Sequence, residues 1–180
     1  MSENTRSDAQ REAFRFPCEQ REYVKTVGEL LVIILSEILI ELGFEVIVPP
    51  QNATGVDLRI FVGNRLIAVA EVLNWSIGSR LTDIRKNNII RNLNDYNCNK
   101  LFIHTVPLSN LDGFTESEIY LLQIGFQVLP EPYYNFFLTK RQVERRTVDS
   151  NSTRSNIRAK ILDYINNYLY AHKYFKFLIA

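Results

Sequence analysis

The chain has 180 residues, of which 46% are hydrophobic and 23% are charged. This length and composition are typical of one globular domain, and they exclude a collagen-like chain, a simple coiled coil and a wholly disordered chain. The chain has 21 basic and 20 acidic residues, which gives a net charge of +1. Any contact with nucleic acid must therefore come from local patches of basic residues.

The N-terminal part combines a polar arm with a strongly apolar helix. Residues 1–20 lack the apolar core of a signal peptide and are predicted to form a mobile arm or a frayed first helix. A helix is predicted over residues 21–42, because its charged positions fall on one stripe, and Gly43 is a natural stop. Glu37 interrupts the apolar run, which is also too short to span a bilayer. We therefore expect a helix of a soluble protein and no contact with a membrane.

Three strands are predicted after this helix, because apolar residues alternate or run together between turn signals. The pair Gly63-Asn64 has the composition of a hairpin turn between the second and the third strand. The third strand is apolar enough to be central in a sheet. The predicted strands cover residues 44–48, 56–62 and 66–73.

The rest of the chain alternates helices and strands. The predicted elements are a helix at 79–96, a strand at 101–106, a helix at 115–123, a short strand at 126–129 and a helix at 157–170. Residues 149–156, which lack apolar side chains, are expected to be a linker or a surface loop. This order predicts an α/β fold with a mixed central β-sheet flanked by helices. Its core would lie in residues 21–130, and residues 131–180 would form a C-terminal helical extension.

Two carboxylates stand where adjacent strands would bring them together. Asp57 opens the second predicted strand, and Glu71 lies near the end of the third. A hard cation such as Mg²⁺ binds carboxylate oxygens and completes its coordination with water and phosphate. Such an ion activates water and stabilises charge on a phosphodiester. Since Glu71 interrupts an apolar strand, where an unpaired carboxylate is costly, a site is favoured over an incidental acid.

The register between these two strands decides whether the carboxylates meet. With a regular two-residue turn, Asp57 would lie opposite Ala70, and Glu71 would face away. A three-residue connection, or a bulge with the same effect, would place Asp57 opposite Glu71. We predict the second register because it gathers the apolar residues of both strands on one face. These residues are Leu58, Ile60, Val62, Leu66, Ala68 and Ala70.

The order of the elements and the spacing of the two acids resemble the PD-(D/E)XK nuclease superfamily. That superfamily includes restriction-endonuclease-like proteins and archaeal Holliday-junction resolvases, and the resemblance covers roughly residues 24–106. It implies an αβββαβ core and a DNA endonuclease that hydrolyses phosphodiester bonds with Mg²⁺ or Mn²⁺. The preferred DNA stays open among junctions, flaps, single strands and duplex ends.

The resemblance also assigns roles to individual residues. Asp57 and Glu71 match the two motif acids that hold the metal. Glu29 matches the glutamate of the first helix better than the runner-up Glu37, and it would bind the metal directly or through water. The backbone carbonyl of Val72 would be a further metal ligand.

The sequence departs from the family at one position. Leu73 stands where the E-x-K motif has a lysine that positions or activates the attacking water. In one alternative, a basic side chain of the next helix (Lys86, Arg80 or Arg85) takes the role of this lysine. In the other, Asn74 or a metal-bound water is sufficient for the reaction without it. We take Lys86 as the replacement. The alternatives are a nuclease-fold protein that binds nucleic acid without cutting it, and a structural or assembly α/β domain.

Two basic clusters are candidates for phosphate contacts, although each is also explained by a solvated helix face. The first cluster is Arg80, Arg85, Lys86 and Arg91, and the second is Lys140, Arg141, Arg145 and Arg146. An aromatic tail favours a homodimer. Its residues are Tyr168, Tyr170, Tyr174, Phe175 and Phe177.

Trp75 either stacks on a base or packs under the end of the sheet. His104 is expected to be a hydrogen-bonded structural residue. Asn92 and Tyr96 resemble a Q-x-x-x-Y pattern found in some related nucleases. Two cysteines without a CxxC pattern favour a reducing, cytoplasmic location over a disulfide framework.

Overall fold

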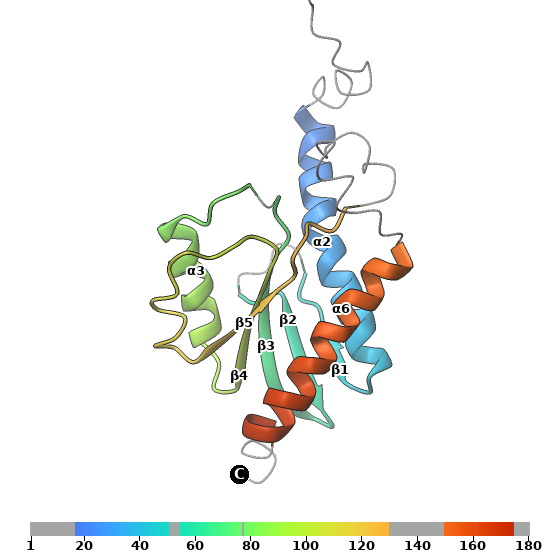
Figure 1. The fold of residues 1–180 in the computed structure, drawn as a ribbon, viewed down its shortest axis with the longest axis vertical. Coiled ribbons are helices and arrows are strands. Elements are labelled where there is room, and N and C mark those ends of the chain that lie inside the picture. Colours follow the sequence, from blue (N-terminus) through green and yellow to red (C-terminus); the bar gives the residue numbers. More distant parts are fainter. Residues whose placement is uncertain (1–16, 51–54, 77, 130–149, 175–180) are drawn as a thin grey trace, which may run out of the picture.

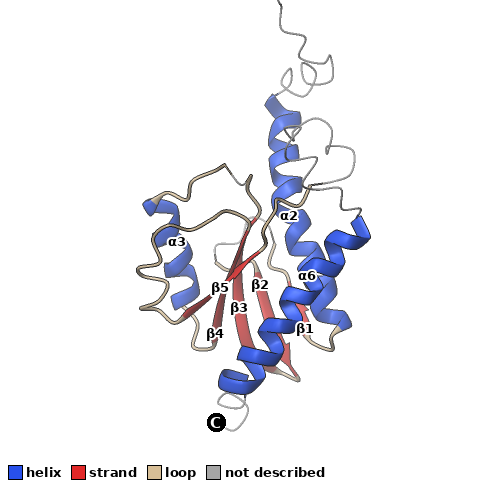
Figure 2. Cartoon of the chain, viewed as in Figure 1, coloured by secondary structure: helices blue, strands red, loops and turns tan. Residues whose placement is uncertain are grey.

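A five-stranded sheet with helices on both faces forms the centre of the protein (Figures 1 and 2). The computed structural model describes residues 17–50, 55–76, 78–129 and 150–174. The helices are α2 (Pro17–Glu41), α3 (Asp83–Asn94) and α6 (Ser150–Tyr164), and α6 continues as the π-helical segment η2 (Ile165–Tyr174). The predicted α/β fold with a mixed sheet and a C-terminal helix is confirmed. No helix in this described part is long and apolar enough to cross a membrane.

The strands follow one another across the sheet in chain order. They are β1 (Glu45–Ile47), β2 (Leu58–Val62), β3 (Arg65–Leu73), β4 (Asn99–His104) and β5 (Ile119–Gln123). The first three pair antiparallel, and β3, β4 and β5 pair parallel. Because a parallel pair needs a crossover, α3 connects β3 to β4 over one face of the sheet.

The sheet separates two apolar clusters. On one face, α2, α6 and η2 pack against the sheet through side chains such as Leu31, Leu35 and Ile161. On the other face, α3 packs through Ile89 and Leu93. Full burial of one such side chain stabilises the fold by about 1.5–3 kcal/mol. The ends of β3 and β4 lie between these layers, and side chains there are enclosed from both sides.

The register between β2 and β3 contains a bulge. Val62 pairs with Arg65 across a two-residue turn, so the predicted three-residue connection is wrong. The register then shifts between Ile60 and Phe61, and Leu58 pairs with Ala70. The alternative that we predicted, a bulge with the same effect, is therefore confirmed. One step beyond this pair, Asp57 lies opposite Glu71.

The bulge also changes one member of the predicted apolar face. Leu66 packs against the cluster under α3, and Ile67 takes its place in the cluster under α2 and α6. The reason is that β3 has one extra residue at the bulge, so the residues of β3 before the bulge point to the opposite face of the sheet from the one predicted. The other predicted residues of this face do pack under α2 and α6.

Three local predictions are wrong. Residues 115–123 are not a helix: turns lead to Glu118, whose φ is 55°, and then β5 pairs with β4. The segment 126–129 contains no strand. The expected linker 149–156 overlaps the first turns of α6, where Arg154 forms ion pairs at 2.7 Å with Glu37 and Glu41 of α2. In each case tertiary contacts decide the conformation of a locally ambiguous segment.

Candidate functional site

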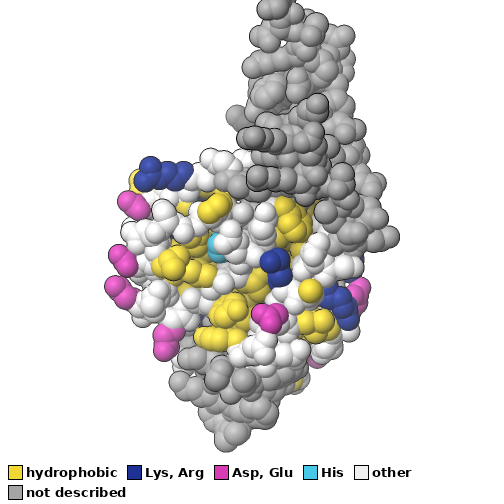
Figure 3. All heavy atoms as spheres, in the orientation of Figure 1, with side chains coloured by type: hydrophobic (Ala, Val, Ile, Leu, Met, Phe, Trp, Pro, Cys, Tyr) yellow, Lys and Arg dark blue, Asp and Glu magenta, His cyan; other side chains and the backbone are white. Residues whose placement is uncertain are grey.

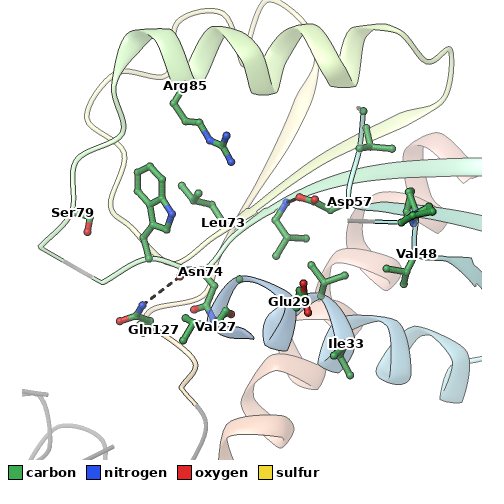
Figure 4. A pocket seen from close by; sticks show the side chains of 18 of the residues that line it. Val27, Glu29, Ile33, Val48, Asp57, Leu73, Asn74, Ser79, Arg85 and Gln127 are labelled. Atoms are coloured by element: carbon green, nitrogen blue, oxygen red, sulfur yellow. Dashed lines mark hydrogen bonds between the residues drawn. The ribbon is translucent and has the colours of Figure 1, made fainter. Parts of the chain in front are cut away.

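A cleft of about 1170 Å³ opens where α2, the end of β3 and the beginning of α3 meet (Figure 4). Three of the predicted metal ligands line it, namely Glu29, Asp57 and Val72. Leu73 and Arg85 line it as well. The topology explains the meeting, because β2 and β3 are neighbours and the crossover helix begins at the same end of the sheet.

Asp57 and Glu71 form a close pair beside this cleft. An Asp57 oxygen accepts a hydrogen bond from the backbone N–H of Val72 at 2.7 Å, and the charge of Asp57 acts on the Glu71 carboxyl group. Glu71 is only 6% exposed, and the side-chain amide of Asn92 donates to its Oε1 at 2.8 Å. These contacts fix both carboxyl groups on the α3 side of the sheet.

The environment of Glu71 strongly disfavours its charged form. Burial, then the charge of Asp57 and the hydrogen bond to it, raise the pKa of Glu71 to about 8. The hydrogen bond from Asn92 and the charge of Arg85 act in the opposite direction but are weaker. At neutral pH and without a cation, the pair therefore retains a proton.

Glu29 is the third predicted carboxylate, and it faces the same cleft from α2. Its Oε1 is buried and has no hydrogen-bond partner among the described residues. The runner-up Glu37 instead pairs with Arg154 of α6, which supports the choice of Glu29. However, no group of three or more His, Cys, Asp or Glu in the described segments is close enough to hold one ion. The structure thus assembles a carboxylate pair, and Glu29 would reach an ion there only through water.

The position of the missing lysine is filled by an apolar side chain. Leu73 is 2% exposed and packs in the cluster under α3, on the same face as Glu71. Lys86 is buried elsewhere: its Nζ donates to the Asn110 carbonyl at 3.2 Å and lies 5.4 Å from the centre of the Phe114 ring. The structure therefore does not bring Lys86 to the carboxylates.

Arg85 is the basic residue of α3 that points into the cleft. In Figure 4 its guanidinium extends from the helix toward the strand that carries Leu73. Arg80 is exposed and does not line the cleft, and Arg91 binds the Asn88 side chain at 3.0 Å on the exposed side of α3. The predicted phosphate cluster is thus reduced to one arginine in the cleft.

The other predicted contact surfaces lie mostly outside the described part. The cluster from Lys140 to Arg146 and the side chains of the tail from Tyr170 onward are outside it. Tyr168, the first aromatic residue of the tail, packs on Tyr120 and Tyr164 of its own chain, at 4.6 and 5.5 Å between ring centres. On the face shown in Figure 3, hydrophobic side chains gather between α3 and α6, and basic side chains are scattered. That view shows no continuous basic surface.

Asn74 ties the walls of the cleft together. Its buried side-chain amide donates to the carbonyls of Val27 and Val128 at 2.7 Å each, and it accepts from the N–H of Val128 at 2.9 Å. The backbone carbonyl of Asn74 also accepts from Gln127 at 3.4 Å, the dashed line in Figure 4. The side chain is fully used and points away from the carboxylate pair, so Asn74 does not replace the missing lysine.

Replacing Asn74 with Leu should destabilise the protein by about 3 kcal/mol or more, because three buried backbone groups lose their partners. Urea unfolding followed by circular dichroism measures this loss. Asn94→Leu is the matched control, since Asn94 is exposed and its partners Ser117 and Lys100 keep access to water. We expect a loss below about 1 kcal/mol for the control. Equal losses would mean that the hydrogen bonds of Asn74 do not hold the cleft walls together.

Two expectations about single residues are settled by the structure. His104 is 2% exposed, its Nδ1 lies 2.7 Å from the Val106 carbonyl, and its ring stacks on Phe102. It is a structural residue, as predicted, and burial lowers its pKa. Asn92, which the sequence singled out only through a weak pattern, holds Glu71.

Asn92 could have been found from helical periodicity. It lies seven residues after Arg85 on α3, so both side chains fall on the same side of the helix. No family model, curated protein or solved structure matches the chain.

Proposed function

We propose that the chain is a metal-dependent DNA endonuclease that resembles the PD-(D/E)XK nucleases and hydrolyses phosphodiester bonds with Mg²⁺ or Mn²⁺. The observation that carries this proposal is the close pair of Asp57 and the buried Glu71, whose carboxyl groups are held by hydrogen bonds from Val72 and Asn92. Two carboxylates in such contact repel each other unless a proton or a cation lies between them. A divalent cation removes this repulsion, and the adjoining cleft gives it access to a substrate.

The donor atoms around the pair fit a hard cation. Asp57, Glu71 and the carbonyl of Val72 offer oxygen atoms, and Glu29 adds a buried oxygen that has no hydrogen-bond partner in the described part. An oxygen-only donor set suits Mg²⁺ or Mn²⁺ better than Zn²⁺. Mg²⁺ is usually held by one or two carboxylates plus waters and phosphate, so a pair is sufficient. When bound, the ion would activate a water and stabilise charge on the phosphate.

The side chains around the pair have distinct tasks in this proposal. Asn92 orients Glu71, and the N–H of Val72 orients Asp57. Arg85 binds a phosphate of the substrate through its planar guanidinium, which matches phosphate oxygens bidentately. An arginine stays protonated and cannot act as a base, so Arg85 replaces the motif lysine only in positioning and charge neutralisation.

The proposal concerns the described part of one chain. The predicted homodimer depends on an aromatic tail whose side chains from Tyr170 onward lie outside that part. A DNA substrate is consistent with the cytoplasmic location that the cysteine content favours. Sedimentation of the purified protein would measure whether two copies associate.

Cleavage of labelled DNA is the test of the proposal. Purified protein is incubated with duplex, single-stranded, flap and four-way-junction DNA in Mg²⁺, in Mn²⁺ and in EDTA. We expect cleavage of at least one substrate that requires the metal and stops in EDTA. Binding without cleavage would support the alternative of an inactive nuclease-fold protein, and neither binding nor cleavage would support a structural or assembly domain.

Two neighbouring cations of α3 provide a matched pair of variants for this assay. Arg85→Ala should lower the rate of cleavage roughly tenfold to a thousandfold, because the cleft loses its phosphate contact. Lys86→Met should leave the rate within about threefold, since Lys86 lies off the cleft and Met keeps its packing over Phe114. The opposite ranking would show that Lys86 reaches the substrate after all.

A further inference from the structure

Trp75 is placed in the wall of the cleft as a fixed aromatic surface. It is the only tryptophan of the chain, and it lies two residues after the end of β3. Its backbone N–H donates to the Thr105 hydroxyl oxygen at 2.8 Å, and that hydroxyl donates to the Trp75 carbonyl at 2.6 Å. The side chain packs partly against the cluster under α3 and also lines the cleft. Trp75 therefore packs under the end of the sheet, as one of its two interpretations predicted, and also presents part of its surface to the cleft.

Other parts of the cleft wall are apolar and open to solvent. Ile33 and Val48 are each 48% exposed, although large hydrophobic side chains are usually covered. Both line the cleft together with Pro49 and Pro50. Figure 4 shows the side chains of Ile33 and Val48 on the same side of the cleft as Glu29 and Asp57. Such a wall suits the faces of bases, whereas the outer surface of a duplex offers mainly sugars and phosphates.

The small number of basic side chains in the cleft also argues against binding of a duplex through its phosphates. Among the described lining residues, Arg85 is the sole Lys or Arg side chain. Proteins that hold duplex DNA through its backbone neutralise several phosphates, whereas one arginine serves one phosphate. The volume of about 1170 Å³ is slightly larger than that of a typical small-molecule pocket, so the cleft accommodates a short stretch of strand.

We propose that the cleft takes single-stranded DNA, with an unpaired base stacked on Trp75 and a neighbouring phosphate held by Arg85 next to the carboxylate pair. The inference rests on the proposed function for its choice of ligand. The stacking contact itself needs neither metal nor cleavage. It can therefore be measured separately from the reaction.

The emission of the single tryptophan reports directly on this contact. In EDTA, the protein is titrated with a short single strand, with a blunt duplex of the same length and with a strand that carries abasic sites. We expect saturable quenching by the single strand and none by the abasic strand, because an abasic site has no ring to stack. The affinity for the single strand should exceed that for the duplex by roughly tenfold or more.

Variants of Trp75 keep the inference testable by affinity. Trp75→Leu retains apolar packing and should weaken single-strand binding roughly tenfold to a hundredfold, as measured by anisotropy of a labelled strand. Trp75→Tyr should restore most of the affinity, and the affinity for duplex should not change in either variant. Circular dichroism confirms that the variants fold. Unchanged emission at saturation, unchanged affinity of Trp75→Leu, or no binding of single strands would each overturn the inference.

The results separate this inference from the proposed reaction. Quenching and single-strand binding without any cleavage in Mn²⁺ would support the stacking site and reject the nuclease. Metal-dependent cleavage of duplex and single strands at equal rates, with unaltered emission, would support the nuclease and reject the stacking site.

Discussion

Asp57→Asn and Glu71→Gln should each lower the proposed metal-dependent cleavage of DNA by a factor of roughly a thousand or more. Both amides keep the size of the original side chain, and Gln at position 71 still accepts the hydrogen bond from Asn92. What each variant loses is a negative charge that would hold the cation. Single-turnover cleavage in Mn²⁺, with enzyme in excess over a labelled substrate, measures the loss without a contribution from product release.

The matched control is Glu116→Gln, an acid-to-amide change at an exposed position outside the cleft. Its rate should stay within about threefold of the wild type. Cleavage at the wild-type rate by Asp57→Asn or Glu71→Gln would exclude the carboxylate pair as the metal site. An equal residual rate in both variants, insensitive to EDTA, would instead identify a contaminating nuclease.

The carboxylate pair could be predicted from the sequence because it depends on strand alternation, which is strongly patterned. Glu71 is visible as an acid inside an apolar strand, and Asp57 opens the strand before it. Their meeting depends on the bulge at Ile60 and Phe61. No residue of that region marks a bulge, so the sequence left two registers open, and only the apolar face decided between them.

The residues around the pair were harder to predict, because their roles depend on the rotation of α3 about its axis. Lys86 lies three residues before Ile89 and seven before Leu93, so it falls on the buried side of the helix. Arg85, one position earlier, is rotated by about 100° and reaches the cleft. Lys86 is the predicted replacement for the motif lysine, but helical periodicity would have favoured Arg85.

The errors in secondary structure share one cause. In residues 115–123 the spacing of Thr115 and Glu118 suggests a helix start, yet Ile119 and Leu122 are buried in β5. The first turns of α6 are polar, and ion pairs with α2 accompany them there. Local patterns cannot show contacts made with residues far away in the chain, and these contacts determined both segments.

Without a divalent cation, the stability of the protein should fall as the pH rises from about 4.5 to about 8. Folded Glu71 keeps its proton up to a pKa of about 8, whereas the unfolded chain releases it near the ordinary glutamate pKa of 4.5. The unfolded state then binds fewer protons than the folded state, so the free energy of unfolding decreases with pH. The expected decrease is on the order of a few kcal/mol. Urea unfolding at several pH values across this range measures it.

Glu71→Gln removes this titration, so the difference in stability between the variant and the wild type isolates the contribution of the pair. Burial lowers the pKa of His104, so protonation of His104 destabilises the fold below about pH 6.5. Because this effect is the same in the variant and the wild type, it cancels when their stabilities are subtracted. Mn²⁺ or Mg²⁺ should restore the stability of the wild type at pH 8, because a cation between the carboxylates replaces the lost proton. The variant should gain much less. Parallel stability curves for the two proteins would show that Asp57 and burial do not raise the pKa of Glu71. Equal gains in stability from metal would show that Glu71 is not a metal ligand.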